Sequence, residues 1–408
     1  MIDFRKIRLD ITLLIAMLIF MAGYHFLIYF NAPWENLDTT IHQIRNDGMI
    51  VVGCITMAFV SMLGLIVLTI RKCPIKLAIP LYIMVIFGVL WTGYTLLYDK
   101  VSITLLLRDS FPPISMLTCG LVLIGYNKNW WELLKKAMLI IACIFVFYSF
   151  YEILIAYSKF GFDYRITYGA PMYLYIIGLY ATYGLIVMTD EWKQNKKILV
   201  LSLVVLLLFN SIILQGRSWL VQTLILFVIY IAKIKTYFKK NDLLKILIPI
   251  SIIGLTIAIF ISNSEIFTGI ADRFQNSGDT RTEQLKAFFE QVSFRELVFG
   301  GGINASYVFK DDPNFHFIDN QVLLYMFRYG IVPAIAYLYL LLYPIVKAFK
   351  LKDKKLMSKS LVLISWFAAM LGLSVYFNLT FGMAHILIMI YTGRLFYEIK
   401  QYKIETTR

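Results

Sequence analysis

Charged residues and cysteines are scarce in this chain, and it contains no glycine- or serine-rich linker. Charged residues make up 16% of the 408 residues, whereas hydrophobic residues make up 60%. The four cysteines lie in apolar segments or at a basic edge, so the sequence indicates neither a disulfide framework nor a zinc site. Nucleic-acid binding would need a soluble basic domain, and the sequence contains none. Together these shortages exclude an ordinary soluble protein.

Long apolar runs, in contrast, recur along the whole chain, and the mean hydropathy is +0.73. Many of the runs approach twenty residues, the length that crosses a hydrocarbon core of about 30 Å. We therefore predict an all-α integral membrane protein with about twelve transmembrane helices. The predicted spans are residues 11–30, 48–70, 77–98, 110–126, 137–157, 170–189, 198–214, 218–232, 243–261, 319–346, 360–377 and 380–397.

The basic residues are distributed as expected for a multi-pass protein of the cytoplasmic membrane. Lys and Arg collect in every second short loop, for example at 5–8, 239–240 and 347–359. This pattern predicts that both termini are cytoplasmic. The net charge of +14 therefore indicates membrane topology and contact with anionic lipid, not nucleic acid. The first apolar run is too long for a signal-peptide core, so we expect it to be retained as a helix.

We predict a single membrane domain, residues 1–408, with one extracytoplasmic loop inserted at 262–318. In this loop, Thr280 to Glu283 has the pattern of a capping box. Apolar residues follow at helical spacing, which predicts an amphipathic helix lying on the membrane. The helix should end near Phe299, because three glycines follow it and favour a turn and a close backbone approach. Residues 310–314 have turn chemistry, and Tyr307, Phe309 and Phe315 are candidates for glycan contact.

Three arginines of the outer face are candidates for binding an anion. Arg217 occupies a hairpin between the seventh and eighth predicted spans, where it is either an interfacial anchor or a bidentate ligand for a phosphate. Arg281 falls in the first turn of the predicted loop helix, where free backbone N–H groups favour an anion. Asp279 and Glu283 could neutralise that charge locally. Arg273 is an alternative for the same role.

Arg328 is expected to lie deep in the membrane. It stands nine residues into the predicted tenth span, about 13.5 Å along a helix that rises 1.5 Å per residue. A charge at that depth needs a partner. An ion pair with Asp109 or Glu152 and contact with a lipid-borne phosphate are the two alternatives.

Asp319 is the first candidate for an acid/base residue, because it stands where the loop enters the predicted tenth span. Asn320 lies beside it, and His316 precedes it by one turn. Aspartate is also a preferred helix N-cap, so a purely structural role is the alternative. His316 titrates in a convenient range but has no evident partner to orient it, which makes it the second candidate.

At these residues the chain resembles the O-antigen polymerase and ligase superfamily, whose members are integral-membrane enzymes that polymerise or transfer lipid-linked bacterial polysaccharide. The resemblance has three sequence parts: Gly-Arg-Ser at 216–218, Arg281 ahead of the glycines at 300–302, and Asp319-Asn320 followed after nine residues by Gly330. The order of spans around one large outer loop is the fourth part. Aspartate replaces the family's histidine at 319, and Pro333 replaces its second glycine. The histidine is typical of ligases, so Asp319 favours a polymerase.

The resemblance implies a C-type, metal-independent glycosyltransferase of polysaccharide or capsule biosynthesis, acting at the outer face of the cytoplasmic membrane. The enzyme would move an undecaprenyl diphosphate-linked glycan onto the next lipid-linked repeat unit. Arg217 and Arg281 would hold the donor diphosphate, and Asp319 or His316 would take the proton of the acceptor hydroxyl. No cofactor is implied, and a chain-length regulator is a candidate partner.

Two other functions are compatible with the sequence. A ligase would use the same donor with another acceptor, such as a lipid core or a protein. A flippase or transporter would move the lipid-linked sugar without making a bond. The sequence disfavours a carrier, because it has no inverted repeat and its charges gather on one face instead of at the midplane.

Overall fold

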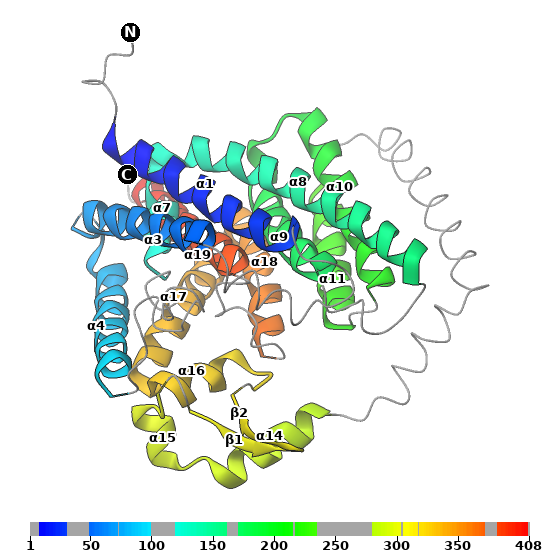
Figure 1. The fold of residues 1–408 in the computed structure, drawn as a ribbon. Helices are drawn as coiled ribbons and strands as arrows, with labels where there is room; N and C mark the ends of the chain where they lie inside the picture. The colour runs from blue at the N-terminus through cyan, green and yellow to red at the C-terminus, as the bar shows by residue number, and fades with distance from the viewer. Residues whose placement is uncertain are drawn as a thin grey trace. The chain divides into compact units, whose positions relative to one another are not determined.

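The computed structural model describes residues 8–30, 49–71, 73–98, 119–160, 170–214, 217–234, 280–302, 305–316, 318–371 and 382–406. The chain divides into two compact units. The first unit comprises Met1–Ala137 and Gln284–Arg408, and the second comprises Met138–Glu283. Apart from one small hairpin, the regular elements of the described residues are helices (Figure 1).

Four described helices are long and apolar enough to cross a membrane: Ile75–Leu97, Lys128–Ile155, Gln194–Ile213 and Ile331–Lys350. Shorter apolar helices lie at Leu9–Gly23, Thr56–Ile70, Leu174–Val187 and Trp219–Lys233. Long apolar helices of this kind are typical of a membrane-embedded, all-α protein. The count of twelve spans and the orientation of the termini stay predictions.

The first unit contains the helices of the N-terminal and C-terminal parts of the chain. They are α1 (Leu9–Phe30), α3 (Met49–Ile70), α4 (Ile75–Leu97), the 3-10 turn η2 (Cys119–Leu121), α7 (Val122–Tyr126), the start of α8 (Lys128–Phe160), α17 (Ile331–Lys350), α18 (Lys354–Met370) and α19 (Gly382–Thr406). Helix α1 packs on α3, α7 packs on α19, and α17 packs on both α4 and α18. The start of α1 is tied to α8, because Trp130 Nε1 donates a 2.8 Å hydrogen bond to Asp10.

The second unit contains the rest of α8, followed by α9 (Ala170–Val187), the 3-10 turn η4 (Thr189–Glu191), α10 (Gln194–Ile213) and α11 (Arg217–Ile234). Its buried polar side chains pair across the helices, as apolar surroundings require. Asn210 Nδ2 donates to Ser149 Oγ at 3.0 Å. Lys233 Nζ donates to the carbonyl of Ile186 at 3.1 Å, close to the end of α9, where a cation is favourable.

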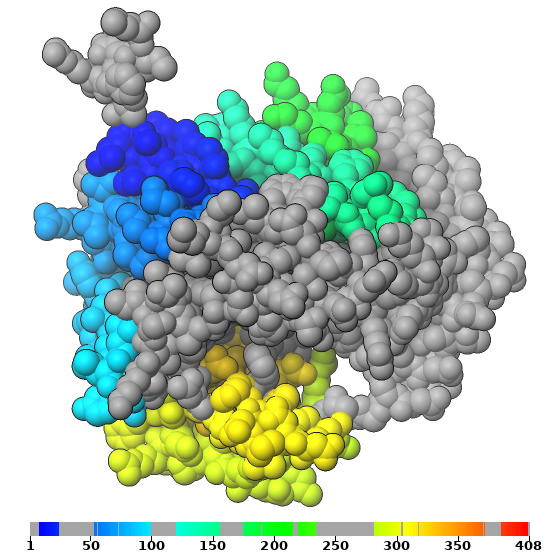
Figure 2. Space-filling model, in the orientation of Figure 1, coloured from blue at the N-terminus to red at the C-terminus, as the bar shows by residue number. Residues whose placement is uncertain are grey.

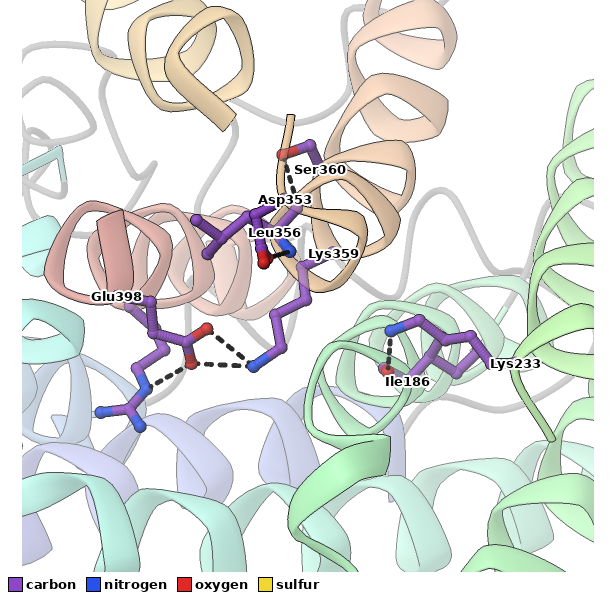
Figure 3. A network of polar contacts seen from close by, with 8 residues as sticks. Ile186, Lys233, Asp353, Leu356, Lys359, Ser360 and Glu398 are labelled. Carbon is purple, nitrogen blue, oxygen red and sulfur yellow. Dashed lines mark hydrogen bonds and ion pairs between the residues drawn. The ribbon is translucent and has the colours of Figure 1, made fainter. Parts of the chain in front are cut away.

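A charged network joins α18 to α19 within the first unit (Figure 3). Lys359 Nζ lies 2.7 and 2.9 Å from the two carboxylate oxygens of Glu398. Arg394 Nε donates to the same carboxylate at 3.0 Å. The Arg394 guanidinium also lies 4.6 Å from the ring centre of Trp131. Because the Lys359 side chain is only 2% exposed, Glu398 neutralises positive charge inside the protein.

The predicted tenth span is wrong as a single helix. The structure divides residues 319–346 into α16 (Gln321–Tyr329) and α17 (Ile331–Lys350), with a break at Gly330. Gly330 has a φ of +92°, which residues with a side chain rarely adopt. A Cβ at this position would lie 2.6 Å from the carbonyl oxygen of Val298. The candidate span is therefore α17 alone, and α16 belongs to the segment before it.

The remaining predicted spans agree with the helices to different degrees. Helix α8 begins at Lys128 and so extends nine residues ahead of the predicted start at 137. The predicted span at 243–261 lies outside the described residues. The predicted span at 110–126 is described only from Cys119, where η2 and the short α7 follow.

Two glycines allow α7 and α19 to cross at close range, and this contact gives a testable prediction. A Cβ on Gly125 would overlap the carbonyl oxygen of Ile390, and a Cβ on Gly393 would overlap that of Val122. We expect Gly125→Ala to lower the free energy of unfolding by about 1–3 kcal/mol, because packed backbones must move apart. Thermal denaturation of the purified protein in detergent would measure the effect.

Gly53 of α3 provides the matched control. A Cβ there would meet no atom within 4 Å. Gly53→Ala should leave the stability unchanged or raise it by about 0.5–1 kcal/mol, because alanine reduces the backbone entropy lost on folding. Equal denaturation midpoints for Gly125→Ala and the unchanged protein would contradict the close crossing.

Candidate functional site

The candidate site lies in a compact part of the first unit, residues 284–330, which we call the loop module. It consists of α14 (Thr280–Gln291) from Gln284 onward, α15 (Phe294–Phe299), strands β1 (Tyr307–Phe309) and β2 (Asp312–Phe315), and α16 (Gln321–Tyr329) (Figure 1). The strands are antiparallel and place Tyr307 opposite Phe315. A turn at Lys310 and Asp311 joins them, with Lys310 in the left-handed region at a φ of +54°. The predicted turn at 310–314 is therefore too long, because its last three residues belong to β2.

Aromatic side chains form the core of the loop module. Phe288 of α14 is fully buried and contacts Tyr307 of β1 and Phe327 of α16 edge to face, with ring centres 5.4 and 5.1 Å apart. The sequence predicted that this apolar face of α14 lies on the membrane, and this is wrong for Phe288. The reason is the β-hairpin, which packs against this face of α14 and which the sequence did not reveal.

The same core removes Tyr307 from the candidates for glycan contact. Tyr307 is only 4% exposed, so its ring has no free face for a sugar. Phe309 and Phe315 pack against this core and lie 5.2 Å apart, between ring centres. Tyr307 therefore has a structural role, whereas Phe309 and Phe315 are partly exposed and their contact with a glycan stays a prediction.

Helix α14 ends earlier than predicted, at Gln291 instead of near Phe299. A second helix, α15, begins after a capping box at Ser293. Ser293 Oγ accepts a hydrogen bond from the Glu296 N–H at 3.2 Å, and the Glu296 carboxylate accepts one from the Ser293 N–H at 2.8 Å. The Ser-Phe-Arg-Glu pattern at 293–296 is the sequence signal that predicts this second start.

The glycines at 300–302 allow a close backbone approach to α16, which confirms that part of the expectation. The N–H of Gly301 donates to the carbonyl of Phe327 at 2.7 Å, and the N–H of Gly302 donates to that of Arg328 at 3.1 Å. A Cβ on Gly300 would lie 2.7 Å from the Arg328 carbonyl oxygen. The N–H groups of Gly301 and Gly302 thus donate to two of the last carbonyls of α16, which the end of a helix leaves without intrahelical partners.

Asp319 lies half-buried immediately before α16, and it is not the N-cap of that helix. Asn320 takes the capping role, because its side-chain oxygen accepts the Leu323 N–H at 3.0 Å. The backbone N–H of Asp319 donates to Gln284 Oε1 of α14 at 2.7 Å, and Gln284 is itself buried. The alternative that the Asp319 carboxylate serves only as a cap is therefore wrong.

Tyr307, in the aromatic core, interacts electrostatically with Asp319. Burial first, and the negative charge of Asp319 second, raise the pKa of the Tyr307 hydroxyl above its usual range. The hydroxyl therefore stays protonated at neutral pH and can donate a hydrogen bond.

His316 has the orienting partner that the sequence did not reveal. Its Nδ1 atom lies 3.1 Å from the carbonyl oxygen of Ala305, which only a protonated Nδ1 can bind. Nε2 is then the basic nitrogen of the neutral ring. Arg328 Nη2 donates to the backbone carbonyl of His316 at 2.9 Å, so α16 holds this residue from the other side.

Arg328 lies in the short helix α16, not nine residues into a spanning helix, because of the break at Gly330. Its Nε atom is buried and has no hydrogen-bond partner among the described residues. Burial lowers the pKa of this guanidinium. The ion pair with Asp109 or Glu152 stays a prediction, since Asp109 lies outside the described residues and Glu152 belongs to the second unit.

The other three predicted arginines cannot be joined to this site by the described contacts. Arg217 begins α11, but its side chain is outside the described residues, as is the whole of Arg273. Arg281 is exposed in the first turn of α14 and belongs to the second unit. The convergence of Arg217 and Arg281 with Asp319 therefore stays a prediction.

A buried polar chain starts at the residue after Asn320, and sequence reasoning missed it. Gln321 is fully buried, and its Nε2 donates to the Tyr337 hydroxyl at 3.3 Å. The same hydroxyl lies 3.4 Å from His385 Nε2, and the Tyr337 and His385 rings stack 5.9 Å apart, between centres. His385 is itself buried, at 1% exposure. This chain ties α16 to α17 and α19.

No group of three or more His, Cys, Asp and Glu residues that could hold a metal ion occurs among the residues described. No protein-family model matches the chain, and no curated protein matches it either. The family resemblance thus depends on the residues at 216–218, 281, 300–302 and 319–333, together with the predicted order of spans around the outer loop.

Proposed function

We propose that this chain is a polysaccharide polymerase that joins undecaprenyl diphosphate-linked repeat units by glycosyl transfer. In the proposed reaction, a hydroxyl oxygen of the acceptor sugar bonds to the anomeric carbon of the donor. The bond from that carbon to the diphosphate oxygen breaks, and undecaprenyl diphosphate leaves with its electron pair. Asp319 takes the proton of the hydroxyl, with His316 as the alternative base.

The observation that carries the proposal is the separation of roles between Asp319 and Asn320. Asn320 supplies the N-cap of α16, so the start of this helix does not depend on the Asp319 carboxylate. Gln284 fixes the Asp319 backbone. His316 is held by Ala305 and Arg328 in the same module. Fixed positions of this kind are what a general base requires.

The arginines supply the second part of the proposed mechanism. A departing diphosphate gains negative charge in the transition state, and fixed guanidinium groups can stabilise it without a metal. Arg328 supports this role, because its buried Nε has no partner among the described residues and its Nη2 donates to the backbone carbonyl of His316. Arg217, Arg281 and Arg273 complete the proposed diphosphate site. The proposal also includes twelve spans, with the loop module on the extracytoplasmic side.

The proposal is tested with the purified full-length chain in nanodiscs and lipid-linked repeat units as the single substrate. A polymerase should produce a ladder of longer lipid-linked glycans and release undecaprenyl diphosphate. A ligase would give no product until a different acceptor is added. A flippase would make no bond and would move the substrate across sealed vesicles, and either of these two results would reject the polymerase.

A further inference from the structure

Helix α15 exposes two large aromatic side chains that the core of the loop module does not use. Phe294 is 80% exposed and Phe299 is 70% exposed, at the two ends of the helix. Phe289 of the neighbouring α14 is 55% exposed. Aromatic side chains contribute most to stability when they are buried, so a group of exposed ones marks a contact surface.

This surface continues onto the end of a candidate membrane span. Gly300, directly after Phe299, packs so closely on α4 that a Cβ there would lie 2.7 Å from the Trp91 ring. Trp91 Nε1 donates to the Tyr329 carbonyl at 3.3 Å. Tyr98, at the end of α4, is 72% exposed. Figure 2 shows the loop module in yellow-green beside α4 in cyan. Trp and Tyr at a span end are typical of the membrane–water interface.

The surface also continues onto α17. Gly330, the residue before α17, packs against the backbone of Val298 and Phe299. In the first turns of α17, Val332 is 46% exposed and Ile335 is 59% exposed. Apolar side chains that are exposed on a candidate span face lipid. Helix α15 therefore lies next to the ends of two helices that are long enough to cross the membrane.

Hydrogen bonds within the chain satisfy part of the backbone at both ends of α15, which lowers the free-energy cost of contact with a bilayer. At its start, the capping box binds the N–H groups of Ser293 and Glu296. At its end, the Gly300 N–H donates to the Glu296 carbonyl at 2.8 Å, and the two following N–H groups bind α16.

From these observations we propose that α15 lies in the bilayer interface, with Phe294 and Phe299 among the lipid acyl chains. The occupant of this surface is lipid and not a protein, because the neighbouring apolar surface belongs to candidate spans. With one arginine and one glutamate, α15 carries no net charge, so apolar contact and not charge supplies the attachment. The loop module is thereby anchored to the membrane independently of any reaction that it performs.

Site-specific fluorescence in the full-length chain tests this proposal. Phe294→Cys and Phe299→Cys variants are labelled with an NBD maleimide in nanodiscs, and the signal of the identically treated unchanged chain is subtracted to remove the native cysteines. We expect blue-shifted emission that is quenched by lipids carrying a doxyl group on the acyl chain. Quenching should be strongest for shallow doxyl positions, because interfacial helices insert only about 5–10 Å.

Lys286→Cys is the matched control, since this α14 side chain is 77% exposed and charged. Its label should show emission typical of water and no lipid quenching. The proposal is overturned if the labels at 294 and 299 behave like the label at 286. It is also overturned if their emission is blue-shifted but insensitive to doxyl lipids, because protein would then cover the surface.

Discussion

Replacing Asp319 with asparagine should reduce polymer formation by about 10²- to 10⁴-fold, which is the contribution of a well-placed general base. Asparagine cannot take the proton of the acceptor hydroxyl, but it retains the shape of the side chain and the backbone N–H that binds Gln284. Asn320 continues to cap α16, so the fold should be unchanged. The rate of ladder formation from lipid-linked repeat units in nanodiscs measures the effect.

Asp311→Asn is the control for this prediction, because it removes an exposed carboxylate from the hairpin turn of the same module. It should retain the full rate. His316→Gln distinguishes the two candidate bases: if His316 is the base, this variant takes the large loss and Asp319→Asn does not. A full polymerisation rate in both Asp319→Asn and His316→Gln would reject an acid/base role for this site.

The second large effect is expected from Glu398→Gln, which should lower the free energy of unfolding by about 3–5 kcal/mol. Glutamine keeps the size of the side chain but removes the negative charge that Lys359 and Arg394 share. Lys359 would then carry its charge at 2% exposure without this carboxylate. Unfolding of the purified chain in mixed micelles, followed by tryptophan fluorescence, measures the change.

Glu405→Gln is the matched control on the same helix. Glu405 is exposed near the end of α19, and surface substitutions of this kind usually change stability by less than about 0.5 kcal/mol. A Glu398→Gln protein as stable as the Glu405→Gln protein would mean that the network contributes no net stabilisation.

The sequence predicted the helical membrane character of the chain because long apolar runs have few alternatives to helices in lipid. It located α1 and α3 to within two residues, at Leu9–Phe30 and Met49–Ile70. It also predicted the close approach at the three glycines and, at Lys310 and Asp311, part of the turn between the strands. Each of these features depends on local composition, which a sequence displays directly.

The features that the sequence did not reveal depend on contacts between distant residues. The strands β1 and β2 span three and four residues, too few for a clear alternation of polar and apolar positions. Asn320 competes with Asp319 as a cap, and both residue types are good caps. The partner of His316, Ala305, is a backbone carbonyl eleven residues away, so no side-chain pattern could reveal it.

The conformation at Gly330 has a consequence for hybrid proteins. A side chain there is excluded twice, by the φ of +92° and by the Val298 carbonyl oxygen. Gly330 therefore has to match the backbone around Val298, which lies more than thirty residues earlier in the chain. A chimera that exchanges the loop module should be joined after residue 330. A junction before Gly330 would take this glycine and the Val298 backbone from two different proteins.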